Sequence, residues 1–140
     1  GRIRYVKEFT DLTLEVIMIT ETFLEVLKHE GVVAIVSQGD KEPHVINTWN
    51  SYIAVAGDQK IVIPVGGMKK TEENINKNNN IKVTLGAREV QGLRYMGTGF
   101  LVEGKASFLY DDKEFDQVKE KYTWARAALV IVPEKITQTL

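Results

Sequence analysis

The segment VGGMKKT, residues 65–71, combines residue types that suit a phosphate group. Its adjacent glycines let backbone N–H groups approach an anion, and the helix expected to begin at Thr71 adds a partial positive charge at its amino end. Its two lysines and its threonine are able to donate charge-assisted hydrogen bonds. Glu72 and Glu73 oppose this interpretation, because carboxylates also occupy helix amino ends. A strand-to-helix turn with solvated lysines therefore stays an alternative, and the spacing differs from that of a Walker A loop.

The segment NTWNSY, residues 47–52, is the second candidate for binding. Strand alternation divides it into two faces, with Asn47, Trp49 and Ser51 opposite Thr48, Asn50 and Tyr52. Neither face is uniformly apolar, so its polar groups must be paired within the protein or must line a cavity. Amide and hydroxyl groups hydrogen-bond the edges of flat heterocycles, and aromatic rings pack beside them. The alternative is an edge strand with outward polar residues and Trp49 in the core.

Other residue types exclude several classes of chemistry. The chain has no cysteine, which excludes disulfides, zinc–thiolate sites, thiolate-bound iron–sulfur clusters and thiol catalysis. Its two histidines, His29 and His44, stand at unrelated spacings, so a transition-metal site is not expected. A G-x-S-x-G nucleophile elbow is absent from the sequence. Trp124, beside Arg126 and before the last expected strand, belongs either to the core or to an interface, and the sequence alone favours its assignment to the core.

The elements that position these residues are expected to be short strands joined by tight turns. Strands are expected at 32–37, 45–50, 52–55, 60–65, 81–85, 100–109 and 127–132, with Pro133 ending the last. Helices are expected at 22–31, 71–78 and between Asp111 and Tyr122. Capping-box spacing supports two of these helices, through Thr22 with Glu25 and through Asp111 with Glu114. The pattern is typical of a mainly β fold, a small antiparallel barrel with peripheral helices.

Length and charge indicate one domain without a nucleic-acid partner. The 140 residues contain no Pro/Gly-rich linker, and 18 Lys+Arg nearly balance 19 Asp+Glu, which removes the electrostatic attraction to nucleic acid. The apolar runs are far shorter than the roughly 20 residues of a membrane span. No signal peptide is visible, so a cytoplasmic location is expected. Residues 1–17 are assigned to an N-terminal extension, either vector-derived or an upstream leader, before a domain at 18–140.

Both motifs belong to a longer resemblance. From Met18 to Leu140 the chain resembles the FMN-binding split-barrel family related to pyridoxamine 5'-phosphate oxidases, and most closely the small bacterial FMN-binding members of that family. The shared segments are EVLKHEGVVAIVSQG (25–39), PHVINTWNSY (43–52), IVIPVGGMKKTE (61–72), VTLGAR (83–88), GTGFL (97–101), WARAALVI (124–131) and QTL (138–140). Segments of this length in this order are a far stronger signal than either motif alone.

The resemblance implies a six-stranded antiparallel split β-barrel, usually a homodimer that binds two FMN molecules at its interface. Carried over by position, the residues that would hold the FMN phosphate are Lys70 and Thr71, with the backbone of Val65, Gly66, Gly67 and Met68. Those that would line the isoalloxazine are Asn47, Thr48 and Trp49. Those by which a second subunit would cover the flavin are Glu30, Tyr52, Trp124 and Leu140, and Gly86 with Ala87 is a further contact. Lys69 leaves open which ammonium reaches the phosphate, and adjacency to Thr71 favours Lys70.

The resemblance favours a non-covalent FMN protein that carries electrons, since the residues suggest no acid–base or nucleophilic constellation. The alternative is an NAD(P)H-dependent flavin reductase or oxidase on the same barrel. A non-redox barrel that stores or senses flavin, or binds another phosphorylated heterocycle, is a third interpretation. A redox protein or NAD(P)H is accordingly the expected partner besides a second copy of the chain.

Overall fold

A computed structural model describes residues 2–8 and 11–140 of the chain, with side chains described from Met18 onward. Strands β1 (Arg2–Glu8) and β2 (Asp11–Ile17) pair with each other as a two-stranded antiparallel sheet that does not join the larger one. The backbone after this hairpin is fixed by Gln59, whose side-chain oxygen accepts hydrogen bonds from the N–H groups of Met18 and Ile19. The assignment of residues 1–17 to an extension stays a prediction.

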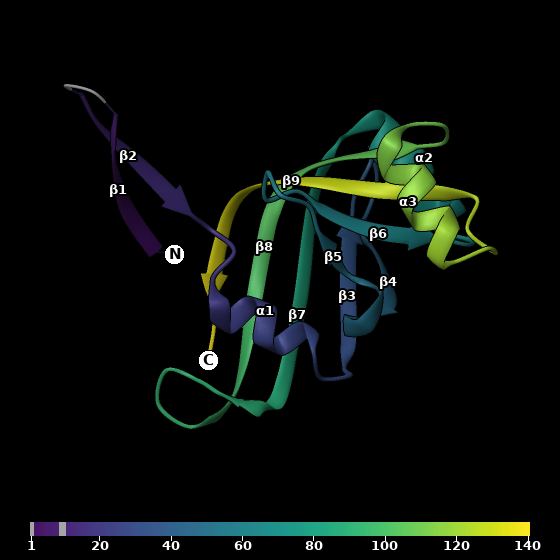
Figure 1. Ribbon diagram of the computed structural model, residues 1–140. Helices are drawn as coiled ribbons and strands as arrows, with labels where there is room; N and C mark the ends of the chain where they lie inside the picture. The colour runs from purple at the N-terminus through teal and green to yellow at the C-terminus, as the bar shows by residue number, and fades with distance from the viewer. Residues whose placement is uncertain (1, 9–10) are drawn as a thin grey trace.

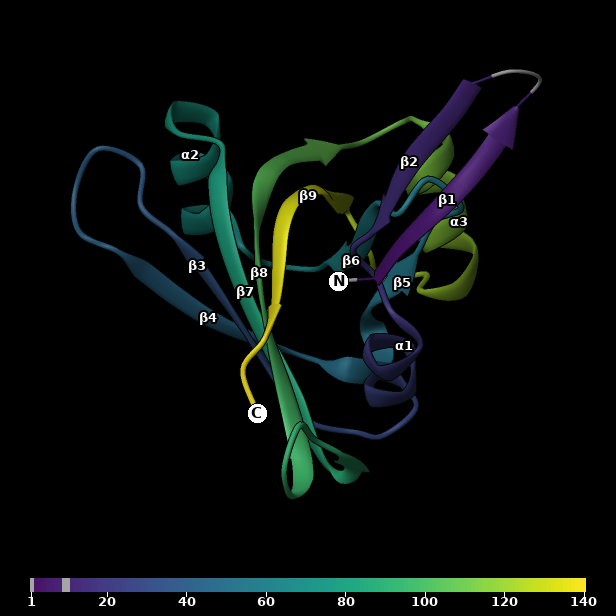
Figure 2. The same cartoon turned by 90° about the vertical axis from the view of Figure 1, so that its left-hand side faces the viewer.

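Seven antiparallel strands form the main sheet, in the order β4-β3-β7-β8-β9-β6-β5. Their bounds are Val32–Ser37 for β3, His44–Trp49 for β4, Ala54–Val55 for β5, Ile61–Val65 for β6, Asn80–Gln91 for β7, Met96–Leu109 for β8 and Ala127–Gln138 for β9. The sheet curls strongly, as Figures 1 and 2 show. The predicted mainly β split barrel is confirmed, with one strand more in the main sheet than the six that the resemblance implies.

The core lies inside this curled sheet. Strand β6 is buried at all five positions, while β3 alternates between buried and more exposed positions, as a strand with one face on the core should. Phe23 and Phe100 meet edge to face, with their ring centroids 5.2 Å apart, and both are almost fully buried. This aromatic pair fixes the first helix against the long strands, because such contacts add to the energy of burial alone.

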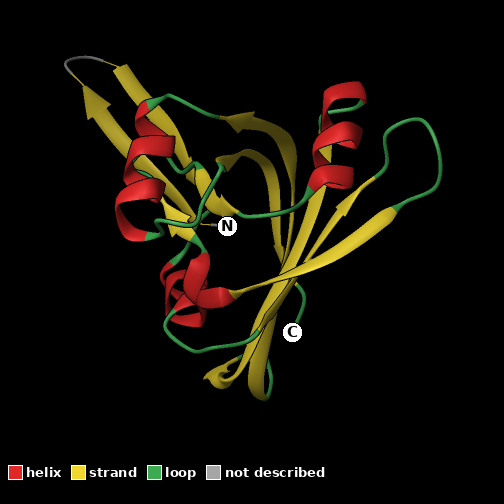
Figure 3. Cartoon of the chain, turned by 90° about the vertical axis from the view of Figure 1, so that its right-hand side faces the viewer, coloured by secondary structure: helices red, strands yellow, loops and turns green. Residues whose placement is uncertain are grey.

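Three helices lie at the periphery of the sheet (Figure 3): α1 (Glu21–Leu27), α2 (Lys69–Lys77) and α3 (Lys113–Lys121). The predicted cap of α1 is wrong by two residues, since Thr20 rather than Thr22 accepts the hydrogen bond from the N–H of Phe23. The cap of α3 is Asp112 rather than Asp111, and its side chain makes no capping bond. No helix in the described part of the chain is long and apolar enough to cross a membrane.

Strand β9 continues to Gln138, so the prediction that Pro133 ends it is wrong. The register with β8 shifts between Glu103 and Gly104, and Pro133 sits at that irregularity, opposite Gly104. Proline lacks an N–H donor and is tolerated where a bulge interrupts the ladder. Gly104 is required there, because a Cβ atom at this position would lie 2.3 Å from the carbonyl oxygen of Val132.

Candidate functional site

The loop between β6 and α2 carries the predicted phosphate segment. Val65 ends β6 and is fully buried, whereas Gly66 and Gly67 are exposed. Met68 precedes the helix in the left-handed region, with φ 59° and ψ 31°. A non-glycine residue there costs on the order of 1 kcal/mol, and such strain gathers at binding sites. The loop therefore holds a backbone shape that the surrounding contacts must maintain.

Thr71 lies in the first turn of α2 and has an unusual environment. The residue is completely buried, yet its hydroxyl oxygen has no hydrogen-bond partner among the described residues. Leaving a buried hydroxyl unpaired costs about 1–3 kcal/mol. Lys69 and Lys70 are exposed beside it, and the Lys70 ammonium is 3.8 Å from the carboxylate of Glu73. An orphaned donor beside two cations fits an anionic ligand at this helix end.

Glu72 is neutralised by the fold, and its presence therefore does not exclude an anion. The Arg126 guanidinium contacts both oxygens of the Glu72 carboxylate, at 3.2 and 3.3 Å, and the Tyr110 hydroxyl donates to the same carboxylate. The bond from Tyr110, followed by Arg126, holds the pKa of Glu72 below its ordinary value despite the opposing effect of burial. The roles of Arg126 and Tyr110 were not predicted from the sequence, in which these residues lie 54 and 38 positions from Glu72.

The lowered pKa of Glu72 predicts a pH dependence of stability. A lowered pKa in the folded state adds stability above the ordinary value of 4.5, and this stability is lost as the pH falls through the lower folded value. Denaturant unfolding of the wild type should therefore show a steeper loss of stability below pH 4.5 than unfolding of Glu72→Gln. Equal slopes in the two proteins would contradict this, and Glu73→Gln, an exposed neighbour, is the control.

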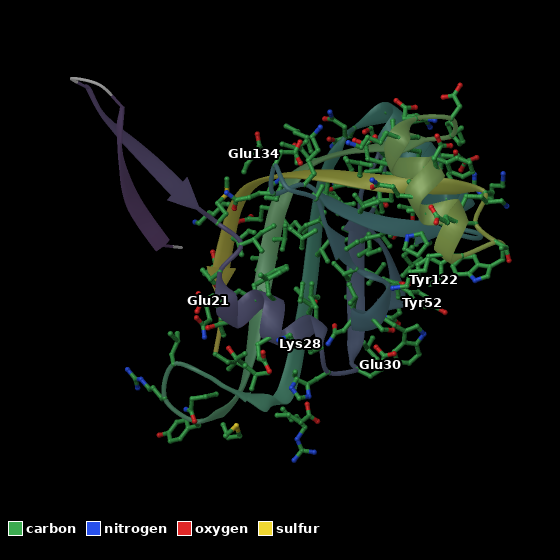
Figure 4. The ribbon with its side chains drawn as sticks, in the orientation of Figure 1. Glu21, Lys28, Glu30, Tyr52, Tyr122 and Glu134 are labelled. Carbon is green, nitrogen blue, oxygen red and sulfur yellow. The ribbon has the colours of Figure 1, made fainter. Side chains whose placement is uncertain are left out.

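An aromatic cluster stands beside the loop. Tyr52, Tyr122 and Trp124 contact one another, with ring centroids 5.1 to 5.7 Å apart. Figure 4 shows the two tyrosines side by side, with Glu30 nearby. The Trp124 ring packs on the loop, since a Cβ atom at Gly66 would lie 3.3 Å from it. Trp124 therefore joins the VGGMKKT loop to Tyr52, the end of the second predicted segment.

The assignment of Trp124 to the core is wrong. Half of the residue is exposed, at 50%, because it precedes β9 and packs over the loop rather than under the sheet. Trp49 is likewise 47% exposed, which contradicts the alternative that placed it in the core. Both tryptophans therefore expose about half of a large aromatic side chain, which a ligand or a partner would cover.

The NTWNSY segment divides as strand alternation predicts, up to its bend. Asn47 and Trp49 are exposed, whereas Thr48 and Asn50 are buried. The strand ends at Trp49, and a single 3-10 turn at Asn50–Tyr52 follows. The Asn47 amide donates to the carbonyl of Val33 across the β3–β4 pair, at 3.2 Å. Asn47, Thr48 and Trp49 thus remain candidates for contact with a ligand ring.

A cavity of about 810 Å³ lies between β7, the β7–β8 connection and the end of the chain. It is lined by Glu30, Gly86, Ala87 and Leu140, four of the predicted residues, and by Leu93, Tyr95 and Met96, among others. Glu30 accepts hydrogen bonds from the N–H and the hydroxyl of Ser51, at 3.1 and 2.7 Å. These bonds, the one from the hydroxyl first, lower the pKa of Glu30.

Apart from Asn47, Thr48 and Trp49 at the end of β4, the predicted residues form two groups rather than one. The loop, Tyr52 and Trp124 lie together, and Glu30, Gly86, Ala87 and Leu140 line the cavity. The bond from Ser51 to Glu30 is the point where the groups approach, since Tyr52 follows Ser51 directly. A ligand that touches both groups needs either to span this junction or to receive the second group from another copy.

Three comparisons place this arrangement among known proteins. A family described as pyridoxamine 5'-phosphate oxidase matches residues 19–140. The FMN-binding protein of Nitratidesulfovibrio vulgaris (strain DSM 19637 / Miyazaki F) is 51% identical over 123 residues, which cover 88% of this chain and all of that protein.

Solved structures share the fold at low sequence identity. HupZ of Group A Streptococcus aligns with a TM-score of 0.72 at 16% identity, covering 86% of this chain and 94% of that one. An FMN-binding protein from Syntrophomonas wolfei aligns with a TM-score of 0.62 at 18% identity, covering 77% and 76%. The split-barrel fold is therefore shared widely, beyond proteins of similar sequence.

Proposed function

The chain belongs to the pyridoxamine 5'-phosphate oxidase family, and we propose that it holds FMN without a covalent bond and transfers electrons through it. Bound FMN supplies the redox chemistry, and the protein supplies binding, orientation and the local electrostatics. The observation that carries the proposal is the buried hydroxyl of Thr71, which has no partner among the described residues and follows Lys70 directly in the first turn of α2.

The phosphate of FMN fits this point of the fold. Its oxygens accept hydrogen bonds only, and the loop offers a hydroxyl, two ammonium groups and the amino end of a nine-residue helix, all of them donors. Glu72 does not compete for these donors, because its oxygens are engaged by Arg126 and Tyr110. Lys70 and Thr71 are therefore the residues we assign to the phosphate.

The flavin ring is proposed to lie against Trp124, whose ring packs on the loop, and against the side chains at the end of β4. Trp124 and Trp49 offer half-exposed rings, and the Asn47 amide is within the same strand as Trp49. Their apolar faces would exclude water from one side of the ring, and Asn47 and Thr48 would bond its polar edge. The protein is expected to bind riboflavin as well, but less tightly than FMN, because riboflavin lacks the phosphate.

Titration of the protein with FMN and with riboflavin tests the proposal. FMN is expected to bind at least about a hundredfold more tightly than riboflavin, since a phosphate adds several charge-assisted hydrogen bonds. Quenching of flavin fluorescence measures both affinities. Equal affinities for the two flavins would contradict the placement of a phosphate at the loop.

We further propose a homodimer in which a second copy covers the cavity and the flavin. The residues around the cavity expose large apolar side chains, with Leu93, Met96 and Leu140 64–66% exposed and Tyr95 79% exposed. A contiguous apolar patch of this kind marks a protein–protein interface. The two groups of predicted residues would then meet at one flavin, one group from each copy.

Leu93→Glu should dissociate the dimer, because it places a charge in this patch. Sedimentation velocity is expected to show a dimer for the wild type and mainly monomer for the variant, which should also bind FMN more weakly. Val132→Glu changes an exposed apolar residue that does not line the cavity and serves as the control. A wild type that is monomeric in solution and still binds FMN would contradict the shared site. So would a monomeric Leu93→Glu variant that binds FMN as tightly as the wild type.

Electron transfer is distinguished from flavin reductase activity by turnover. A carrier loaded with FMN should exchange electrons rapidly with a redox protein and should not oxidise NADH or NADPH continuously. Sustained consumption of either nucleotide, with dioxygen or free flavin as the acceptor, would instead establish the reductase. Stopped-flow and steady-state absorbance measurements cover the two cases.

A further inference from the structure

Arg126 binds three successive carbonyl groups of the loop. Its backbone N–H donates to the carbonyl of Val65 at 2.8 Å, which continues the pairing of β6 with β9. Its guanidinium Nε lies 3.0 Å from the carbonyl oxygen of Gly66 and 3.0 Å from that of Gly67, and Nη2 also donates to Gly67. One residue thereby determines the direction of consecutive peptide groups in the loop.

The carbonyl directions determine where the neighbouring N–H groups point. In a trans peptide the C=O and N–H bonds are antiparallel, and the described residues contain no cis peptide. The N–H groups of Gly67 and Met68 belong to the peptides whose oxygens face Arg126, so they point away from it. Neither N–H group has a partner in the part of the chain that the structure describes. They are two unused donors beside the unused hydroxyl of Thr71.

The guanidinium of Arg126 also contacts a second group, the carboxylate of Glu72. Glu72 contacts two of its guanidinium nitrogens, and Tyr110 donates to the Glu72 carboxylate. The side chains of Arg126 and Glu72 are largely buried, at 24% and 16% exposed, so the pair is shielded from solvent and holds its geometry. The hydrogen-bonded series Tyr110–Glu72–Arg126 connects the segment after β8, and helix α2, to the loop.

We propose that Arg126 is a positioning residue for phosphate recognition, which turns the N–H groups of Gly67 and Met68 toward the anion while Glu72 and Tyr110 hold the guanidinium in place. This inference rests on the proposed FMN function and names the part of the chain that shapes its phosphate site. The carbonyl oxygens, which would repel an anion, are directed to the guanidinium and their N–H partners are left free.

The first test compares FMN with riboflavin in Arg126 variants. Arg126→Gln should weaken FMN binding about tenfold to a hundredfold, since two N–H donors lose their orientation, and should change riboflavin binding less than about twofold. Arg126→Lys keeps the charge but lacks the planar fork that reaches two carbonyls, so it should resemble Arg126→Gln. Equal losses for both flavins, or full recovery with lysine, would overturn the proposal.

The second test changes the charge without touching Arg126. Glu72→Gln removes a negative charge near the anion, so a purely electrostatic role predicts tighter FMN binding, whereas loss of the clamp predicts binding several-fold weaker. Glu73→Gln removes the same charge one residue later and has no contact with Arg126. We expect Glu72→Gln to weaken FMN binding and Glu73→Gln not to weaken it. Tighter binding in both variants would overturn the proposal, even if Arg126→Gln failed to fold.

The outcomes separate this inference from the function on which it rests. A wild type that does not prefer FMN over riboflavin would refute the phosphate site itself. A preference that is lost in Lys70→Ala with Thr71→Ala, but kept in Arg126→Gln, would refute only the positioning role.

Discussion

Replacing Lys70 and Thr71 together by alanine is expected to weaken FMN binding by at least about 3 kcal/mol, roughly a hundredfold or more, because each charge-assisted hydrogen bond to the phosphate contributes about 1.5–3 kcal/mol. Riboflavin binding should change little, since it has no phosphate. Fluorescence titration of both flavins measures the difference. Lys77→Ala, an exposed lysine at the far end of α2, is the matched control.

Substitution of Thr71 alone is expected to have opposite effects on FMN binding and on stability. The hydroxyl of Thr71 is buried without a partner when no ligand is present, so Thr71→Val should leave the free energy of unfolding of the flavin-free protein unchanged or raise it. The variant should nevertheless bind FMN more weakly. Destabilised flavin-free protein with unchanged FMN affinity would show that the hydroxyl is structural.

A comparison of Lys69→Ala with Lys70→Ala decides which ammonium group reaches the phosphate. The variant that loses more FMN affinity identifies the lysine that binds it.

Asn50→Leu is expected to destabilise the protein by about 2–4 kcal/mol, the second large effect. Asn50 is fully buried, and its amide nitrogen donates to the carbonyls of His29 and Gly86, both at 2.9 Å, with a third contact to Val26 at 3.4 Å. These bonds connect the end of α1, the bend after β4 and strand β7. Leucine has a similar volume and leaves the carbonyls without their donor, which is costly in a buried site.

Urea unfolding of the flavin-free protein measures this loss. Asn47→Ala is the control, because Asn47 is exposed and its amide makes one bond, to Val33. That variant should lose less than about 1 kcal/mol. Similar losses in the two variants would contradict the structural role assigned to Asn50. A loss confined to FMN affinity would instead make Asn50 a ligand-binding residue.

The strands were largely predictable because their hydrophobic patterns are local. The expected strand at 32–37 coincides with β3, and the expected strand at 60–65 differs from β6 by one residue. The errors arise where a residue that is distant in the sequence determines the end of a strand or the exposure of a side chain. Strand β9 passes Pro133 because Gly104 of the neighbouring strand allows an irregular register, and Trp124 is exposed because the loop at Gly66 receives its ring.

Only the hydrogen-bond donors of the candidate site were predictable from the sequence. The glycines, lysines and threonine of one short segment indicate an anion by their types and spacing. The segment does not reveal that Glu72 is neutralised, since Tyr110, just after β8, and Arg126, just before β9, are distant in the sequence. Likewise, the segment at 47–52 does not separate Asn47 from Asn50, which differ in burial and not in chemistry. Residue type indicates what a group is able to bind, and packing decides whether it is free to do so.

The visible absorption spectrum of the purified protein, with mass identification of the ligand released on denaturation, tests the central claim most directly. The account predicts a yellow protein that bleaches on reduction and releases FMN of unmodified mass, since the chain has no cysteine for a thioether link. Colourless protein that gains no flavin spectrum on addition of FMN would contradict it, as would release of a different ligand that FMN does not displace.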